Sequence, residues 1–264
     1  MSDTKPSPAP ALPAATILLL RDGANGIEVF MQTRFEGRDR FSGALLFPGG
    51  KVDAQDHDDL RAWSHGAESL SDEHFVLWVA AIREAFEECG VLLVRERGNG
   101  AIISAQRLQT LADWRDRLNA GSAKLIDMLR QENLLLACDQ LVRFGNWVTP
   151  VIRAKRFDTH FFLARAPHDH VLLHDGREST DSLWITIADA LQGQKDKRYN
   201  IVFPTQSNLE KLQLAGADVD AVLNRAAAES VYRVEPRIEK REDGYYVLIP
   251  EAAGYPTCIN KAEA

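Results

Sequence analysis

The segment Arg83-Glu84-Ala85-Phe86-Glu87-Glu88 has the residue types and the spacing best suited to chemistry in this sequence. On a helix, Glu84, Glu87 and Glu88 stand at positions i, i+3 and i+4, so their carboxylates share one face within a single turn. Carboxylates this close repel one another unless a cation lies among them. Mg²⁺ prefers carboxylate oxygens together with water and phosphate oxygens, so the spacing predicts a divalent-metal site.

A solvated charged face is the ordinary explanation for a glutamate-rich helix, and Arg83 with Glu87 can form an ordinary i,i+4 ion pair. The surrounding sequence favours the metal site instead. The acidic residues border an apolar stripe at helical spacing that ends at Gly90, a typical helix terminator. Upstream, an apolar run ends at Phe47-Pro48-Gly49-Gly50, where regular strand pairing is hard to continue and a tight turn is expected.

Together these segments resemble the Nudix family, whose signature is Gly, five residues, Glu, seven residues, then Arg-Glu-(apolar)-x-Glu-Glu-x-Gly-(apolar). Residues 83–91 match the second half at every specified position. In the first half, which starts at Gly50, Asp56 takes the place of the glutamate. Between Asp56 and Arg83 lie 26 residues where the usual motif has seven, so an insertion of 19 residues splits the signature.

A split signature is similar to one Nudix subgroup, the peroxisomal coenzyme A diphosphatases of animals and their bacterial relatives. The resemblance covers roughly residues 14–210. It extends the second half of the signature to cover Ala80 to Leu93 and includes three further segments in the same order, which are Trp147-Val148-Thr149-Pro150, Arg156-Phe157-Asp158-Thr159 and Leu183-Trp184-Ile185-Thr186.

The resemblance implies that Glu87 and Glu88 bind divalent ions, with Mg²⁺ or Mn²⁺ as the cofactor. Glu84 would bind metal or help to position the attacking water. Arg83 would hold Glu84 or Glu87 in place. The Gly50 carbonyl is a further ligand candidate, because glycine lets the backbone approach a metal closely.

Four residues are candidates for the catalytic base and for substrate contacts. Glu178 lies in a polar loop before a predicted strand, similar to catalytic-loop glutamates of relatives, and an exposed loop residue is the equal alternative. Arg34 and Arg40 flank the loop before the Gly-Gly turn, where they could meet phosphates or the 3′-phosphate of coenzyme A, although solvated arginines are common. Gly49, in the turn itself, is a candidate substrate contact.

The implied reaction is hydrolysis of a diphosphate linkage in a nucleoside diphosphate derivative. Coenzyme A or acyl-CoA is the expected substrate, with 3′,5′-ADP and (acyl-)4′-phosphopantetheine as products. A pyrophosphatase for ADP-ribose or a dinucleotide is an alternative enzyme. A noncatalytic Nudix-like binding module is an alternative of another class, and the intact glutamates argue against it.

Composition limits the classes of binding partner and the cellular compartment that we expect. The chain has 264 residues, 45% of them hydrophobic, and a net charge of -7 that disfavours nonspecific nucleic-acid binding. Cys89, Cys138 and Cys258 are far apart, so neither a disulfide framework nor a zinc ribbon is indicated. The apolar stretch Ala14 to Leu20 is too short to span a bilayer. We therefore expect a cytoplasmic enzyme with a small-molecule substrate and no membrane partner, and the sequence indicates no oligomeric state.

The elements that must position the glutamates follow from periodicity and turn signals. The expected fold class is α/β, a Nudix α/β/α sandwich with a mixed sheet, a helical insertion and a C-terminal hairpin around Asp243-Gly244. The glutamate helix should begin after Ser71 as N-cap and run to Cys89. The predicted organisation is a disordered tail at 1–13, a single domain at 14–250 with insertions at about 57–75 and 104–142, and a C-terminal tail at 251–264.

Several further elements are expected at specific positions. Strands are predicted at 16–20, 27–34, 44–47, 147–152, 159–164, 182–187, 232–239 and 245–249, and helices at 187–191 and 206–214.

Overall fold

The computed structural model describes residues 9–34, 43–170 and 179–261. Its centre is an eight-stranded sheet with the order β10-β2-β1-β9-β8-β11, in which β3 also pairs with β2 and β4 with β1. The β1–β9 and β8–β11 pairs are parallel and the others are antiparallel, so the mixed sheet is confirmed. The strands are β1 (Ala11–Gly23), β2 (Gly26–Arg34), β3 (Leu45–Leu46), β4 (Gly49–Lys51), β8 (Val142–Val148), β9 (Arg156–Arg165), β10 (Ser179–Thr186) and β11 (Arg233–Val234).

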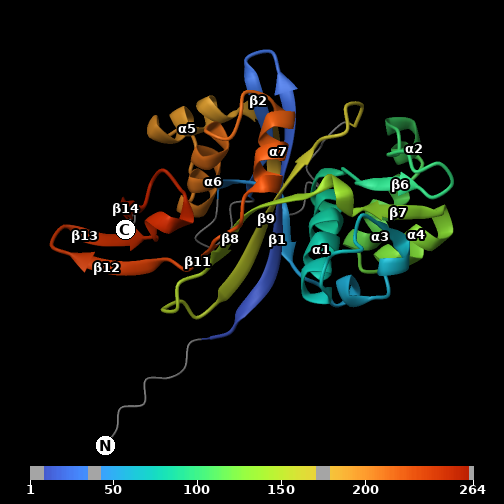
Figure 1. The fold of residues 1–264 in the computed structure, drawn as a ribbon, viewed down its shortest axis with the longest axis horizontal. Coiled ribbons are helices and arrows are strands. Elements are labelled where there is room, and N and C mark those ends of the chain that lie inside the picture. Colours follow the sequence, from blue (N-terminus) through green and yellow to red (C-terminus); the bar gives the residue numbers. More distant parts are fainter. Residues whose placement is uncertain (1–8, 35–42, 171–178, 262–264) are drawn as a thin grey trace, which may run out of the picture.

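Helices cover both faces of this sheet (Figure 1). On β1, Ile17 and Leu19 join the apolar cluster of the glutamate helix, while Leu18 and Leu20 join a second cluster on the opposite face. Burial on both faces explains why this strand reads as a continuous apolar run. The α/β/α sandwich is thus confirmed, with α1 (Asp72–Cys89) on one face and α5 (Ile187–Lys195), α6 (Phe203–Gln213) and α7 (Val219–Ala228) on the other.

The two predicted insertions fold against each other. The second contains α2 (Ala105–Gln109), α3 (Ala112–Asn119) and α4 (Leu125–Glu132), followed by strand β7 (Leu134–Ala137). In a small sheet, β7 pairs with β6 (Val94–Glu96) and with β5 (Ser64–His65), which lies in the first insertion. The expectation of a mainly helical segment is wrong from residue 134, because a short apolar run takes its conformation from the strands that it pairs with.

Both predicted tails contain described residues that belong to strands. Residues 11–13, expected in a disordered tail, begin β1 and pair with β9. The hairpin is confirmed as β12 (Arg237–Arg241) and β13 (Gly244–Leu248), but β14 (Ile259–Lys261) pairs with β13 inside the expected C-terminal tail. In the same segment, the buried Tyr255 hydroxyl accepts a hydrogen bond from Trp147 at 2.8 Å. Contacts with distant residues order both segments.

In the part of the chain that the structure describes, no helix combines the length and apolar character needed to cross a membrane.

Candidate active site

Local signals set both ends of α1, the helix that carries the glutamates. The Ser71 side chain caps the first turn by accepting a hydrogen bond from the backbone N–H of His74. At the other end, Gly90 adopts the left-handed conformation, with φ of 72°, and its N–H donates to the carbonyls of Ala85 and Phe86. These bounds match the sequence prediction and place the glutamates in the last two turns.

Arg83 is the centre of a buried polar network. Its Nε and Nη2 atoms donate to both carboxylate oxygens of Asp56, at 2.8 and 3.0 Å. Its Nη1 donates to Glu84 Oε1 and to Glu87 Oε2, each at 2.9 Å. Nη2 also donates to the carbonyl of Lys51 at 3.0 Å. The guanidinium therefore contacts both glutamates that the sequence analysis paired with it. Its bond to the Lys51 carbonyl connects them to the segment that follows the Gly-Gly turn.

Asp56, at the position of the first signature glutamate, is part of this hydrogen-bond network. It lies in the 3-10 helix Ala54–His57 and is fully buried. Both carboxylate oxygens accept from Arg83, and Oδ2 also accepts from the backbone N–H of Asp53 at 2.8 Å. Its observed role is therefore to hold the guanidinium.

Glu88 connects the helix to the Gly-Gly turn. Its Oε2 accepts from the backbone N–H of Gly49 at 2.8 Å and from Gln32 Nε2 at 2.5 Å. A Cβ on Gly49 would lie 2.4 Å from the Ala15 carbonyl, and its φ is +153°, so only glycine fits there. The sequence analysis missed Gln32, which is 56 positions from Glu88. The amide of Gly49, a predicted substrate contact, is engaged by this carboxylate.

Gly50 leaves room for a carboxylate. A Cβ at this position would lie 2.4 Å from Glu84 Oε1 and 2.7 Å from its Cδ. The Glu84 side chain therefore presses directly on the backbone of the turn. This close approach explains why the second residue of the Gly-Gly pair is glycine.

We expect Gly50→Ala to lower kcat about 100-fold, because the new methyl group displaces the Glu84 carboxylate, and misplacing a catalytic group by about 1 Å can cost that much. Steady-state kinetics with a thermal melt check this. Gly98→Ala is the matched control, since a Cβ there meets nothing within 4 Å. Full activity in Gly50→Ala would contradict the importance of this contact.

Burial makes the two glutamates that face Arg83 costly to ionise. It raises the pKa of Glu84 to about 7, while Arg83 opposes the rise and the charge of Glu87 adds to it. Burial raises the pKa of Glu87 as well, against the opposing effect of Arg83. A divalent cation beside them would stabilise both charged forms.

The carboxylates of Glu84 and Glu87 suit a metal ion whose other ligands are water and the phosphates of a bound substrate. Among the described residues, no three His, Cys, Asp or Glu side chains form a ready-made metal cage. Mg²⁺, however, is usually bound through one or two carboxylates plus waters and substrate phosphates. Arg83 bonds Oε1 of Glu84 and Oε2 of Glu87, which leaves the second oxygen of each carboxylate available as a ligand.

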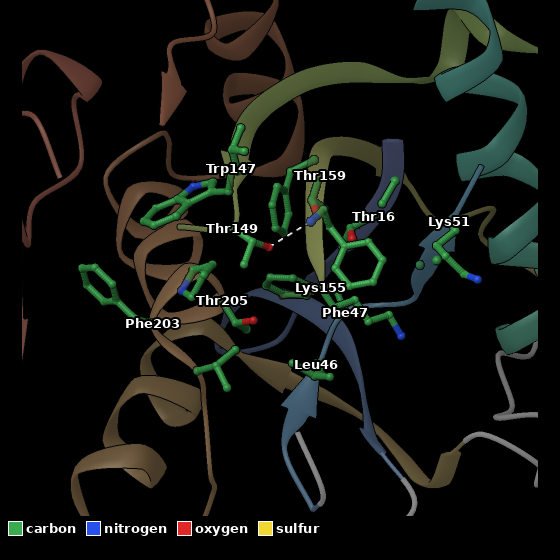
Figure 2. A pocket seen from close by; sticks show the side chains of 18 of the residues that line it. Thr16, Leu46, Phe47, Lys51, Trp147, Thr149, Lys155, Thr159, Phe203 and Thr205 are labelled. Atoms are coloured by element: carbon green, nitrogen blue, oxygen red, sulfur yellow. Dashed lines mark hydrogen bonds between the residues drawn. The ribbon is translucent and has the colours of Figure 1, made fainter. Parts of the chain in front are cut away.

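Residues of this network take part in lining a cavity of about 600 Å³. Side chains from several other elements also line it, among them Thr16, Trp147 and Phe203 (Figure 2). Gly50, Arg83 and Glu84 line one part of it. Five aromatic side chains also line it, namely Phe47, Trp147, Phe157, Phe161 and Phe203. Its size and its combination of apolar and polar walls are typical of a site for a small organic ligand.

Three cations in the cavity were missed by the sequence analysis. Lys51, Arg153 and Lys155 line it, and none of them forms an ion pair within the described ranges of the chain. Lys51 follows the Gly-Gly turn, and the other two follow the Trp147-Val148-Thr149-Pro150 segment. Their position beside these two motifs was the signal that could have found them.

Of the three remaining predicted site residues, only Arg34 lies within the described residues. Arg34 is the last residue of β2, and its backbone pairs with Ser179. Arg40 and Glu178 lie outside the described residues. Their proposed roles therefore stay predictions.

Comparison with known proteins decides the family. The model of the NUDT19 Nudix domain matches residues 61–212. The chain belongs to this Nudix family. The predicted resemblance is confirmed, and the chain is a hydrolase of diphosphate linkages, from a family that generally uses divalent metals.

Individual relatives agree with this assignment. This Nudix hydrolase is 24% identical to the acyl-coenzyme A diphosphatase NUDT19 of Xenopus laevis, over 89% of this chain and 73% of the relative. It is 26% identical to the human protein of the same name, over 86% of this chain and 72% of that one. A NUDIX hydrolase from Alicyclobacillus acidocaldarius has a similar structure, with a TM-score of 0.67 and 28% identity, covering 84% of this chain and 99% of that chain.

Proposed function

We propose that this Nudix hydrolase cleaves the diphosphate of coenzyme A or acyl-CoA, releasing 3′,5′-ADP and (acyl-)4′-phosphopantetheine. The observation that carries the proposal is that Arg83 and Glu84 line a cavity whose walls also carry cationic and aromatic side chains. Two relatives named acyl-coenzyme A diphosphatase support it. The proposed partner is a small molecule in the cytoplasm, without nucleic acid or membrane, in agreement with the net charge of -7.

In this proposal Glu84 and Glu87 hold Mg²⁺ or Mn²⁺, and Glu88 and the Gly50 carbonyl are further ligand candidates. The bound ions would neutralise the diphosphate oxygens and lower the pKa of the attacking water. Arg83 keeps the two carboxylates at a fixed spacing through its shared Nη1.

The attacking water needs a group that accepts its proton. Glu84 is one candidate, in the alternative role in which it positions the attacking water instead of binding an ion. Glu178 stays the other candidate, on the basis of its place in the sequence.

The cavity lining suits the rest of the substrate. Coenzyme A carries an adenine ring, which an aromatic side chain such as Phe47 or Phe157 can stack against. Its phosphates carry several negative charges, which Lys51, Arg153 and Lys155 can receive. Arg34 and Arg40 are further phosphate-binding candidates from the sequence, as Gly49 is for other substrate contacts.

We expect the double variant Arg153→Gln and Lys155→Gln to raise KM for coenzyme A at least tenfold, with kcat little changed. Each charge-assisted hydrogen bond contributes about 1.5–3 kcal/mol to binding, and a tenfold change in affinity corresponds to about 1.4 kcal/mol. Steady-state kinetics measure the split. Lys240→Gln, an exposed change on β12 outside the cavity, is the control. An unchanged KM would remove these two cations from substrate binding.

Product analysis tests the proposed substrate. The purified protein is incubated with coenzyme A and Mg²⁺, and the products are separated by chromatography and identified by mass. The expected products are 3′,5′-ADP and 4′-phosphopantetheine. Release of AMP from ADP-ribose, with coenzyme A left intact, would overturn the substrate and keep the hydrolase.

A further inference from the structure

The last turn of α1 carries the backbone of two proposed metal-site residues. A helix leaves its final carbonyls without intrahelical donors. Here the N–H groups of Gly90 and Val91 donate to the carbonyls of Ala85 and Phe86, further back along the helix. The carbonyls of Glu87 and Glu88 therefore need donors from another part of the chain.

Helix α3 of the second insertion supplies these donors. Arg115 Nε donates to the Glu87 carbonyl at 3.1 Å, and its Nη2 donates to the Glu88 carbonyl at 2.9 Å. Asn119, one turn further along α3, donates from Nδ2 to the Glu87 carbonyl at 3.2 Å. One rigid guanidinium thus spans two consecutive carbonyls.

The helix end is shaped to receive this guanidinium. A Cβ on Gly90 would lie 3.1 Å from Arg115 Nη1, so the glycine that ends the helix also makes room for the arginine. A cation at a helix C-terminus is favourable, because the exposed carbonyls carry partial negative charge. The planar fork of arginine fixes the distance between two acceptors, which a lysine ammonium cannot do.

We propose that Arg115 is a positioning residue for the metal site: it holds the backbone of Glu87 and Glu88 so that their carboxylates meet the ion. This inference rests on the proposed function, because it takes these glutamates as metal-site residues. The insertion that carries Arg115 therefore contributes to metal affinity without contacting the metal. Loss of this contact weakens metal binding and leaves turnover at saturating metal close to wild type.

Direct metal binding tests the proposal without relying on activity. Mn²⁺ is titrated into the protein while electron paramagnetic resonance measures free Mn²⁺, and the Mg²⁺ dependence of hydrolysis is measured in parallel. Since loss of a group that orients metal ligands typically costs about 10–100-fold in affinity, Arg115→Gln is expected to weaken Mn²⁺ binding at least tenfold. Arg115→Lys is expected to bind with intermediate affinity.

A matched control lies on the same helix. Arg117→Gln removes the same charge from α3, but the Arg117 guanidinium lies 3.9 Å from the centre of the Trp114 ring, so this variant should bind Mn²⁺ as wild type does. Should Arg115→Gln fail to fold, Asn119→Ala removes one of the two side-chain bonds to the Glu87 carbonyl and is expected to weaken Mn²⁺ binding by a smaller factor.

The outcomes separate the two proposals. Wild-type Mn²⁺ affinity in Arg115→Gln, with or without a lower melting temperature, overturns the positioning role. Weakened Mn²⁺ binding in a protein that leaves coenzyme A intact supports the role of Arg115 and overturns the substrate. A wild-type protein that binds no Mn²⁺ and whose hydrolysis does not depend on Mg²⁺ overturns both.

Discussion

Glu87→Gln is expected to lower kcat about 1,000-fold at saturating metal while the protein stays folded. Glutamine has nearly the same shape, but its neutral amide cannot act as an anionic ligand. A loss of this size corresponds to about 4 kcal/mol of transition-state stabilisation. Folding should survive, because Arg83 keeps its bonds to Asp56 and Glu84. Steady-state kinetics over a range of Mg²⁺ concentrations, with a thermal melt, measure both effects.

Glu73→Gln is the control for this variant. It makes the same chemical change on the exposed first turn of α1, away from the network, and should retain wild-type kinetics. If Glu87→Gln kept more than about half of the wild-type kcat, Glu87 could not be a metal ligand in the reaction.

Removing the guanidinium of Arg83 should have the largest effect on stability. In Arg83→Met, the carboxylate of Asp56 stays fully buried without its counter-charge, and Glu84 and Glu87 lose the same partner. Breaking a buried ion pair by removing one partner costs about 3–5 kcal/mol. We expect a loss of this size in the free energy of unfolding, together with loss of activity. Urea denaturation measures the first.

A second substitution separates charge from packing. Asp56→Asn, added to Arg83→Met, removes the orphaned charge and should recover part of the lost stability without restoring turnover. Arg225→Met breaks an exposed pair with Glu229 and should cost less than about 1 kcal/mol. A loss below about 1 kcal/mol in Arg83→Met would mean that the network contributes little to the fold.

The sequence predicted the bounds of helix α1 well because its signals are local. The N-cap Ser71 and the terminator Gly90 bound one apolar stripe, and the three glutamates lie within that span. The central strands, including β1, were predicted because burial on both faces produces a continuous apolar run. The Gly-Gly turn was also evident, although the reasons for each glycine are contacts with Ala15 and Glu84.

What the sequence did not reveal depends on contacts between distant residues. Gln32 reaches Glu88 across 56 positions, and Arg115 reaches it across 27. The residues of strand β7 were predicted as part of a helical segment, because their pairing with β5 and β6 is not evident from the sequence. Asp56 was identified as the substitute for the signature glutamate, but only the fold shows that both its oxygens hold Arg83. Periodicity and motif spacing describe neighbours in the chain, so they do not report such pairs.

The most direct test of the account is to locate the metal. Crystals of the protein soaked in Mn²⁺ with a nonhydrolysable diphosphate nucleotide are measured for anomalous scattering. We predict a peak in direct contact with carboxylate oxygens of Glu84 and Glu87, beside the Gly-Gly turn, with the diphosphate on its far side. An ion bound elsewhere, or no peak at these carboxylates while nucleotide occupies the cavity, would contradict the account.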